Sequence, residues 1–262
     1  MKNIKKIIAF ALLAIMAVTC FAGCKGQETI VVAYTIYAPM NYMENGELVG
    51  FDTELAKAVF EGMDYKVVFK EIDWKTKYTE LDSGNIDCIW NGFTANAADD
   101  DGVQRSEKVD FSYNYMENLQ VVVAKKGANI ATKEDLKGKI ADAELGSAGE
   151  TYAKGFEGTT FKGAVKQTDC LLSVKTGNAD FAVVDAQLAK SYCGKGDYAD
   201  LEIIEALSSD VEYYAIGFKK GSELTSKVNE QLEKLAADGT INKLGEKYNV
   251  ATSVITDFSS QK

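Results

Sequence analysis

Short apolar runs alternate with longer amphipathic stretches along most of this chain. The apolar runs have the length and the β-branched or aromatic composition of strands. They lie at 30–35, 65–72, 86–90, 109–112, 118–124, 139–143, 180–184 and 211–219. The stretches between them repeat apolar residues every three or four positions, as at Leu55, Val59 and Met63, which is typical of helices with one buried face. This alternation predicts an α/β fold with parallel or mixed sheets.

One helix–glycine–strand pattern occurs twice. In each copy a glycine ends a predicted helix, Gly84 or Gly177, and an apolar strand follows within a few residues. Ligands of α/β sheets bind beyond the carboxyl ends of the strands, and both of these strands end in polar groups. The polar groups are Asn91, Gly92 and Thr94 in the first copy and Asp185 in the second. Two such copies predict two similar lobes that present polar groups to a shared space.

Local signals predict several turns and caps. Asn45-Gly46 predicts a hairpin turn, and Asp52 is expected to cap the helix that follows it. A long helix is expected from Ser222, with an interruption at Gly239. The final helices have no strands of their own, so we expect them to return to the first lobe.

The first residues are typical of a secretory signal peptide. Three lysines precede an apolar segment at 7–18, which is shorter than a membrane span. The tetrapeptide Phe-Ala-Gly-Cys at 21–24 resembles the bacterial lipobox, in which the cysteine is lipidated and becomes the mature N-terminus. We therefore expect a lipoprotein signal peptide at 1–23, lipidation of Cys24 and a polar tether at 24–28. The alternative is ordinary cleavage that releases a free secreted protein.

Length and charge narrow the possible partners. Removing the first 23 of 262 residues leaves 239, which is enough for two modest lobes with their own cores. It also removes three lysines and no acids, which leaves 26 basic against 39 acidic residues and a net charge of −13. A chain this acidic, without a basic stripe, is expected to avoid nucleic acid and anionic membrane surfaces.

The use of histidine and cysteine limits the chemistry. The sequence contains no histidine, which excludes Ser-His-Asp and Cys-His catalysis and most zinc sites, and we expect no metal and no cofactor. Cys88, Cys170 and Cys193 are expected to be buried thiols, with a Cys170–Cys193 disulfide as the alternative. The acidic run at 99–101 is expected to be a solvated loop. A calcium site is the alternative there, although the spacing does not match a known calcium loop.

Several motifs occur in one order along nearly the whole mature chain. They lie at 46–56, 84–87, 105–112, 135–139, 145–150, 183–185 and 237–240. On these motifs the chain resembles the polar amino-acid-binding proteins of bacterial ABC importers (solute-binding protein family 3). The resemblance implies a two-lobed type II periplasmic-binding fold with two hinge strands, near 120–122 and 214–217. The implied parts are lobe 1 at 29–119 and 217–255, lobe 2 at 122–213 and a C-terminal tail at 256–262.

The resemblance also implies which residues bind the backbone of the ligand. Arg105 matches the arginine that grips the α-carboxylate, and Asp185 matches the acid that pairs with the α-ammonium. A surface ion pair is the alternative role for Arg105, and a helix cap is the alternative for Asp185. The other matches, in segments that hydrogen-bond the carboxylate or the ammonium, are Asn91, Gly92, Thr94, Ser147 and Ala148. The family usually has Thr or Ser where Ala148 stands, so one hydroxyl contact is lost here.

Aromatic positions bear on the side chain of the ligand. Tyr37 and Trp74 match an aromatic pair that sandwiches it, although each residue alone is more often part of a core. Tyr34 stands where binders of basic amino acids typically carry an acid, which argues against lysine or arginine as the ligand. Trp90 either adds bulk near the pocket or, by alternation along its strand, lies in the core.

The resemblance implies a solute-binding lipoprotein that captures an L-amino acid between its lobes and delivers it to an ABC transporter permease. It implies a monomer without enzymatic activity, outside the cytoplasm and lipid-anchored to the outer face of a Gram-positive plasma membrane. One alternative is a cyclohexadienyl-dehydratase-like enzyme on the same fold, but the sequence shows no second acid placed beside Asp185. Another alternative is a sensory surface protein with the same binding site.

Overall fold

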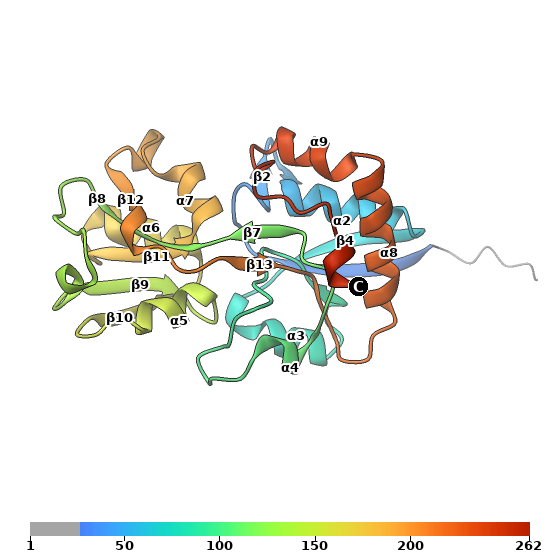
Figure 1. Cartoon of the computed structure of the whole chain (residues 1–262), viewed down its shortest axis with the longest axis horizontal. Helices are drawn as coiled ribbons and strands as arrows, with labels where there is room; N and C mark the ends of the chain where they lie inside the picture. Colours follow the sequence, from blue (N-terminus) through green and yellow to red (C-terminus); the bar gives the residue numbers. More distant parts are fainter. Residues whose placement is uncertain (1–26) are drawn as a thin grey trace, which may run out of the picture.

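The computed structural model describes residues 27–262, which form two lobes with strands running between them (Figure 1). Each lobe is built on one five-stranded sheet within this part of the chain, so the predicted two-lobed α/β fold is confirmed. The first sheet has the order β4-β1-β5-β14-β6. Its strands are β1 (Glu28–Tyr34), β4 (Tyr65–Glu71), β5 (Cys88–Ile89), β6 (Asp110–Phe111) and β14 (Gly217–Phe218).

The second sheet has the order β10-β9-β11-β8-β12. Its strands are β8 (Gln120–Lys125), β9 (Ile140–Glu144), β10 (Thr160–Ala164), β11 (Phe181–Asp185) and β12 (Leu201–Ile204). In both sheets three neighbouring strands run parallel: β4, β1 and β5 in the first, and β10, β9 and β11 in the second. Parallel strands end at one edge of a sheet, so each lobe gathers three strand ends on one side.

Helices cover both sheets. Those of the first lobe are α2 (Phe51–Glu61), α3 (Lys77–Asp82), α4 (Arg105–Lys108), α8 (Leu224–Ala237) and α9 (Thr240–Lys247), with the 3-10 turn η2 (Trp74–Thr76) before α3. Those of the second lobe are α5 (Ala148–Lys154), α6 (Gln167–Thr176) and α7 (Ala186–Tyr192). The last two helices, α8 and α9, pack against α2, which confirms the predicted return of the chain to the first lobe (Figure 1). Gly239 separates them in a left-handed conformation with φ 79°.

Two short strands cross from one lobe to the other. They are β7 (Met116–Asn118) and β13 (Glu212–Tyr214), which pair antiparallel between the two sheets (Figure 1). The paired crossing lies a few residues before the hinge positions expected from the sequence. Gln120 already pairs with Asp185 inside the second sheet, and Gly217 already pairs with Ile89 inside the first.

The local predictions had mixed outcomes. Asn45 and Gly46 both have positive φ, 52° and 85°, and they connect β2 (Tyr42–Glu44) to β3 (Glu47–Val49) as predicted. The cap assigned to Asp52 is wrong, because Gly50 is the N-cap of α2 and Asp52 lies in its first turn. The buried carboxylate of Asp52 instead accepts the Gly92 N–H at 2.8 Å, and it thereby ties α2 to the end of β5.

The sequence analysis missed two strands of the second sheet. These are β10 and β12, which form its two edges. Edge strands are only half buried, and β10 shows mostly exposed or intermediate residues without regular alternation. A pattern-based prediction therefore had little signal for these edges.

The three cysteines of the described chain are free thiols, as the sequence analysis predicted. Cys88 and Cys170 are buried free thiols and Cys193 is a half-buried one, so the alternative disulfide is wrong. Within residues 27–262 no cluster of three or more acidic or cysteine side chains could hold a metal ion. In the same range no helix is long and apolar enough to cross a membrane. The predicted signal peptide at 1–23 and the lipidation site Cys24 lie outside the described residues.

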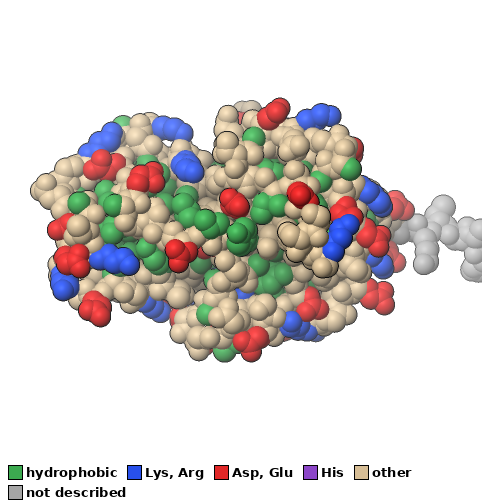
Figure 2. Space-filling model, viewed as in Figure 1, with side chains coloured by type: hydrophobic (Ala, Val, Ile, Leu, Met, Phe, Trp, Pro, Cys, Tyr) green, Lys and Arg blue, Asp and Glu red, His purple; other side chains and the backbone are tan. Residues whose placement is uncertain are grey.

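The visible surface carries charges of both signs. Figure 2 shows acidic and basic side chains interspersed over this face, together with a notch between the two lobes. On the side of that notch where α7 faces α9, residues from both lobes, including Lys190 and Lys247, line a cavity of about 360 Å³. Residues of both lobes therefore approach one another along this notch.

Candidate functional site

The strand ends of the two sheets meet in a small cavity between the lobes. Its volume is about 10 Å³, which is about the space of one water molecule. From the first lobe it is lined by Trp74, Asn91, Gly92, Thr94 and Arg105, and from the second by Glu144, Ser147, Ala148, Gln167 and Asp185. Most of the expected ligand residues thus share one cavity, and the structure holds them in a closed cleft.

Several interactions between the lobes hold this cleft closed. The carbonyl oxygen of Gly146, in the second lobe, accepts hydrogen bonds from Lys77 Nζ at 2.8 Å and from Arg105 Nη2 at 3.2 Å. Nearer the surface, Lys166 Nζ lies 2.6 Å from a carboxylate oxygen of Glu71. All three donor–acceptor pairs join one lobe to the other, so each of them breaks when the lobes separate.

Arg105 is buried at the first-lobe wall of the cavity, with 1% of its surface exposed. Its Nε donates to Asp99 at 2.8 Å, its Nη1 donates to the Thr94 carbonyl at 3.2 Å, and its guanidinium lies 5.1 Å from the centre of the Phe93 ring. A surface ion pair, the alternative role considered for Arg105, is therefore wrong. The guanidinium is instead a fixed cation at the cleft.

The acidic loop before Arg105 supports this cation. The expectation of a solvated run is wrong for Asp99, which is buried and also receives Lys108 Nζ at 2.9 Å. Burial opposes the ionisation of Asp99, but the charge of Arg105 and the hydrogen bond from Lys108 outweigh it and lower the pKa of Asp99 to about 2. Asp101 also pairs with Lys108, at 2.8 Å. Asp99 of this loop thus pairs with Arg105 on the Nε side of its guanidinium.

Asp185 lies at the second-lobe wall, at the end of β11. Its Oδ1 accepts from Asn118 Nδ2 at 2.8 Å and from Gln120 Nε2 at 2.6 Å, and its Oδ2 accepts from Gln167 Nε2. Asp185 is the N-cap residue of α7, but its side chain makes no capping hydrogen bond there. It is therefore more than a helix cap, because neutral amides hold its carboxylate at the cavity.

The structure places other acids close to Asp185, which the sequence analysis did not find. Glu212 on β13 accepts from the same two amides, Asn118 at 2.5 Å and Gln120 at 2.8 Å. Burial, followed by the charge of Asp185, raises the pKa of Glu212 to about 7. Glu144 at the end of β9 also feels the Asp185 charge and lines the same cavity. The earlier argument against a pair of acids is therefore wrong.

The segment after β5 is built tightly against the first lobe. Asn91 Nδ2 donates to the Thr35 carbonyl at 3.0 Å and to Asn41 Oδ1 at 2.6 Å, so this side chain is already engaged. Gly92 has φ 57°, and a Cβ there would lie 2.7 Å from the Tyr37 ring. Only glycine fits this turn, which places Thr94 at the mouth of the cavity.

The aromatic candidates lie at different depths. Trp74 lines the cavity and packs edge-on against Phe93, with ring centres 5.4 Å apart. Tyr37 lies behind the lining, where its hydroxyl is 2.8 Å from that of Tyr214. Tyr34 lies away from the cavity, against Phe69, with ring centres 6.2 Å apart. In the closed form, Trp74 is therefore the aromatic residue of this set in contact with the cavity.

Trp90, the fourth aromatic candidate, is fully buried in the first-lobe core. Its ring packs against Phe60, with ring centres 5.8 Å apart, and against Tyr115 at 6.1 Å. Of the two positions considered for Trp90, the core is therefore confirmed.

The turn before α5 forms the floor of the cavity in the second lobe. Ser147 caps α5, since its hydroxyl accepts from the Glu150 N–H at 3.0 Å. The Gly146 N–H donates to the Glu150 carboxylate at 2.5 Å, so one backbone donor of this turn is already used. Ala148 follows and lines the cavity with its methyl group.

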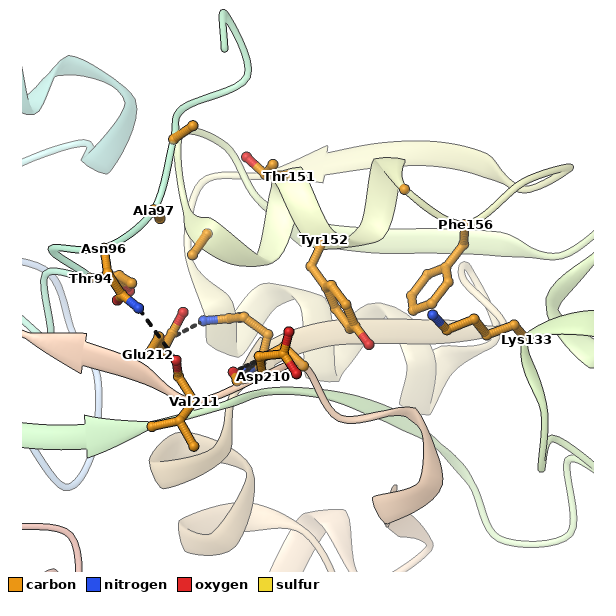
Figure 3. Close-up of a pocket in the computed structure, with 15 residues that line it drawn as sticks. Thr94, Asn96, Ala97, Lys133, Thr151, Tyr152, Phe156, Asp210, Val211 and Glu212 are labelled. Carbon is orange, nitrogen blue, oxygen red and sulfur yellow. Dashed lines mark hydrogen bonds between the residues drawn. The ribbon is translucent and has the colours of Figure 1, made fainter. Parts of the chain in front are cut away.

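A larger pocket of about 400 Å³ adjoins the cavity (Figure 3). The two share Thr94 and Ala148, and from Thr94 and Glu212 the pocket extends past Tyr152 to Phe156 of the second lobe (Figure 3). In Figure 3, Asn96 of the first lobe points at the crossing strand, where its amide donates to the Val211 carbonyl at 3.3 Å. This volume is in the range of small-molecule sites, so the pocket can accommodate part of a ligand that extends from the cavity along the cleft.

Several site residues were missed from the sequence. They are Lys77, Asn118, Gln120, Glu144, Gln167 and Glu212. One signal could have revealed Glu144, because it follows an apolar strand directly, as Asp185 does. The amides on other strands gave no local signal, because only the folded chain brings them to Asp185.

Comparisons with known proteins identify relatives of this chain. The sequence profile of the bacterial extracellular solute-binding proteins, family 3, matches residues 29–251. The chain is 29% identical over 249 residues to the arginine-binding extracellular protein ArtP of Bacillus subtilis, which covers 92% of this chain and 93% of ArtP. The matched range includes both lobes and both crossings.

Solved structures are similar over the same region. An ancestral arginine-binding protein bound to arginine has a TM-score of 0.76 at 35% identity, and the match covers 84% of this chain and 97% of that chain. The ancestral amino acid-binding protein AncCDT-1, a precursor of cyclohexadienyl dehydratase, has a TM-score of 0.74 at 28% identity and covers 84% and 95%. These matches confirm the type II periplasmic-binding fold. With its profile match over nearly the whole described chain, the protein belongs to the bacterial extracellular solute-binding proteins, family 3, and resembles their polar amino-acid-binding members.

Proposed function

We propose that this protein captures an L-amino acid between its lobes, as a monomer, and delivers it to the permease of an ABC transporter. One observation carries the proposal: Arg105 and Asp185 reach the same cavity from opposite lobes. An amino acid carries a carboxylate and an ammonium at fixed separation, and burying either without an opposite charge is costly. The cation would take the carboxylate and the acid would take the ammonium.

The remaining contacts follow from the positions of the other candidates. Thr94 would hydrogen-bond the ligand backbone, with Asn91 and Gly92 holding that segment in place. Ser147 and Ala148 would contact the carboxylate from the second lobe. Trp74 would cover one face of the ligand side chain and, once the cleft opens, Tyr37 would cover the other. Tyr34, behind Phe69, would act only at the rim of the site.

A ligand that contacts Arg105 and Asp185 together requires the lobes to separate first, because the cavity that these two residues line has a volume of only about 10 Å³. We propose that 29–119 with 217–255 moves against 122–213 about β7 and β13. Ligand that touches both lobes favours the closed form through its differential affinity for that form. The contacts at Gly146 would close behind it.

The anchoring of the protein is a separate proposal, supported by the lipobox-like sequence at 21–24. Lipidated Cys24 would hold the protein on the outer face of the plasma membrane of a Gram-positive cell. Fractionation tests this, because Cys24→Ser should release the protein or leave it unprocessed. Wild-type protein found entirely in the medium would contradict the anchor.

A thermal-shift screen of the common L-amino acids plus cystine tests the binding proposal. A ligand at about 100 times its Kd adds about 2.7 kcal/mol to the free energy of unfolding, which gives a clear rise in melting temperature. The D-enantiomer of the best ligand is the control. If no amino acid shifts the melting temperature or gives heat in calorimetry, the proposed function is wrong.

An enzyme remains the second candidate, and a specific observation favours it. Asp185 and Glu212 share two amide donors, and burial raises the pKa of both, so one acid could donate a proton while the other accepts one. The similarity to AncCDT-1 adds to this. Incubation with cyclohexadienyl substrates and analysis of the products separates the two functions, since a binding protein returns the ligand unchanged.

A further inference from the structure

We propose that Glu144 recognises a cationic side chain, so that the ligand is an L-amino acid of the arginine or lysine class. This inference rests on the proposed function, because it assigns a partner for the ligand side chain in a site whose other charges bind the α-carboxylate and the α-ammonium. Glu144 ends β9, which runs parallel to β11, so its side chain emerges beside Asp185 at the same sheet edge.

The Glu144 carboxylate is buried without a complete set of partners. Only 3% of the residue is exposed, and it lines the cavity between the lobes. Its Oε1 has no hydrogen-bond partner among residues 27–262. A buried oxygen in this state is costly, and a ligand cation placed in the cavity would remove that cost.

The other charged groups of the cavity already have partners. Both oxygens of Asp185 accept amide hydrogen bonds, and Arg105 is paired with Asp99. Both are also the natural partners of the ligand backbone. Once the backbone charges are matched, Glu144 is the acid of the cavity lining that a ligand side chain can pair with.

Lys77 does not fill that role, although its charge acts on Glu144. Its Nζ donates to the Gly146 carbonyl at 2.8 Å and lies 4.6 Å from the centre of the Tyr78 ring. Burial, and then the charge of Arg105, lowers the pKa of Lys77 to about 7, so it is a poor permanent partner for an acid. The site therefore lacks a permanent cation opposite Glu144 in the described chain.

Trp74 completes the environment that a cation would meet. Its ring lines the same cavity, and aromatic faces attract Lys and Arg side chains. The argument from Tyr34 against a basic ligand loses its basis, because Tyr34 lies against Phe69 and the acid comes from the opposite lobe.

The charges around Glu144 give the proposal a second readout. Burial and then Asp185 raise the pKa of Glu144 well above its usual value; Asp73 and Asp169 add to this, and Lys77 opposes it. In the free protein, the surroundings of Glu144 therefore oppose its ionisation. A cation bound beside Glu144 should lower that pKa, so at a pH between its free and bound values a proton is released and the heat of binding depends on the ionisation enthalpy of the buffer.

Calorimetry with arginine and citrulline tests the inference, because citrulline has nearly the shape of arginine without its charge. A charge-assisted hydrogen bond predicts that the wild type prefers arginine by about 10- to 100-fold. Glu144→Gln should remove that preference, mainly by weakening arginine, and should remove the additional proton release that arginine shows over citrulline. Lysine should behave as arginine does, and glutamine as citrulline does.

Asp142→Asn is the matched control. Asp142 lies two residues earlier on β9, is also buried, and also has an oxygen without a partner in the described chain, but it lies outside the cavity lining. This variant should keep the preference for arginine. If Asp142→Asn loses it as Glu144→Gln does, the general charge of the lobe is responsible and the inference is wrong.

The outcomes separate the inference from the function on which it rests. If the wild type binds citrulline or glutamine as tightly as arginine, Glu144 does not select charge, while the proposed function stands. This comparison needs no variant, so it holds even if Glu144→Gln fails to fold. If no amino acid binds at all, the proposed function fails first.

Discussion

The two lobes neutralise their charges in different ways. The first lobe holds its cation, Arg105, against a carboxylate, Asp99, whose pKa falls to about 2. The second lobe holds its acid, Asp185, with the neutral amides of Gln120 and Gln167. The charge of Arg105 and the hydrogen bond from Lys108 lower the pKa of Asp99 in the first lobe, whereas burial raises the pKa of Asp185 in the second lobe and its amide hydrogen bonds oppose that rise only in part. The cleft therefore has one permanent pole and one adjustable pole.

This difference matters for recognition. A permanent cation suits the α-carboxylate, which is ionised at any ordinary pH. The acids of the second lobe and of β13 repel one another, so a ligand ammonium relieves a cost already present in the free protein. At Arg105 the free energy of binding should thus come from a new attraction, whereas at Asp185 it should come largely from the relief of repulsion between acids.

The largest expected effect is that of Arg105→Ala. Truncating one partner of a buried charge pair costs about 2–5 kcal/mol, which is roughly 30- to several-thousand-fold in affinity. The free protein should also melt earlier, because Asp99 loses its closest cation. Calorimetry and melting curves measure both effects.

Arg105→Lys is the matched control, since it keeps the charge near Asp99 but loses the planar fork. It should recover part of the stability and less of the affinity. If Arg105→Ala binds the best ligand within a few-fold of wild type, the match of Arg105 to the carboxylate-binding arginine of the family is wrong and the carboxylate anchor lies elsewhere.

Asp185→Asn should lose nearly as much affinity but none of the stability. Removing this charge relieves its repulsion with Glu212, so the melting temperature of the free protein at neutral pH should stay constant or rise. The contrast with Arg105→Ala tests the two-pole comparison directly.

Ligand analogues provide the control for both variants. A decarboxylated amine should bind Arg105→Ala and wild type alike, and a deaminated acid should bind Asp185→Asn and wild type alike. If each variant still discriminates against its own analogue, the assignment of the two poles is wrong.

The permanent pole was predictable from the sequence and much of the adjustable pole was not. Arg105 stands five residues before the Asp110-Phe111-Ser112 motif, and family resemblance was enough to find it. The role of Asp99 was missed, because three consecutive aspartates are typical of a solvated loop, and only the structure shows that one of them is buried against Arg105. The local sequence pattern does not indicate which member of a charge run is buried.

The second lobe shows the same limit more strongly. Asp185 ends an apolar strand and was predicted, yet its partners Asn118, Gln120 and Glu212 lie far away along the chain. They sit on β7, β8 and β13, at the crossings that the sequence placed a few residues too late. Strand pairing brings them together, and short crossing strands carry too few residues to fix register from pattern alone.

The adjustable pole predicts opposite pH trends for binding and stability. Glu212 has a folded-state pKa of about 7, above its usual 4.5, so the folded protein binds more protons than the unfolded chain between these values. Asp52, with a pKa raised by burial from 3.8 to about 7, acts in the same window. The free energy of unfolding should therefore fall as pH rises from about 4.5 to about 7.

Affinity should rise over the same window, since the ligand ammonium needs an ionised acid pair, by up to about tenfold per pH unit for one linked proton. Isothermal titrations and denaturant melts across this range measure both trends. Glu212→Gln should flatten the affinity profile and leave the contribution of Asp52 to stability. An affinity that is independent of pH would show that the second pole is as permanent as the first.

The smallest expected effect is that of Lys166→Ala, which removes the ion pair with Glu71 across the mouth of the cleft. The two charges are 2.6 Å apart, but their side chains are 37% and 42% exposed. Exposed pairs contribute roughly 0–1 kcal/mol, which is less than about sixfold in affinity. This pair exists only when the lobes are closed, so its whole contribution should appear as a bias toward closure.

Salt screens exposed charges far more than buried ones, so wild type and Lys166→Ala should converge at high ionic strength, while Arg105→Ala should stay weak. If Lys166→Ala weakens binding as much as Arg105→Ala does, closure rather than recognition of the two poles limits affinity, and the difference between the lobes loses its functional meaning.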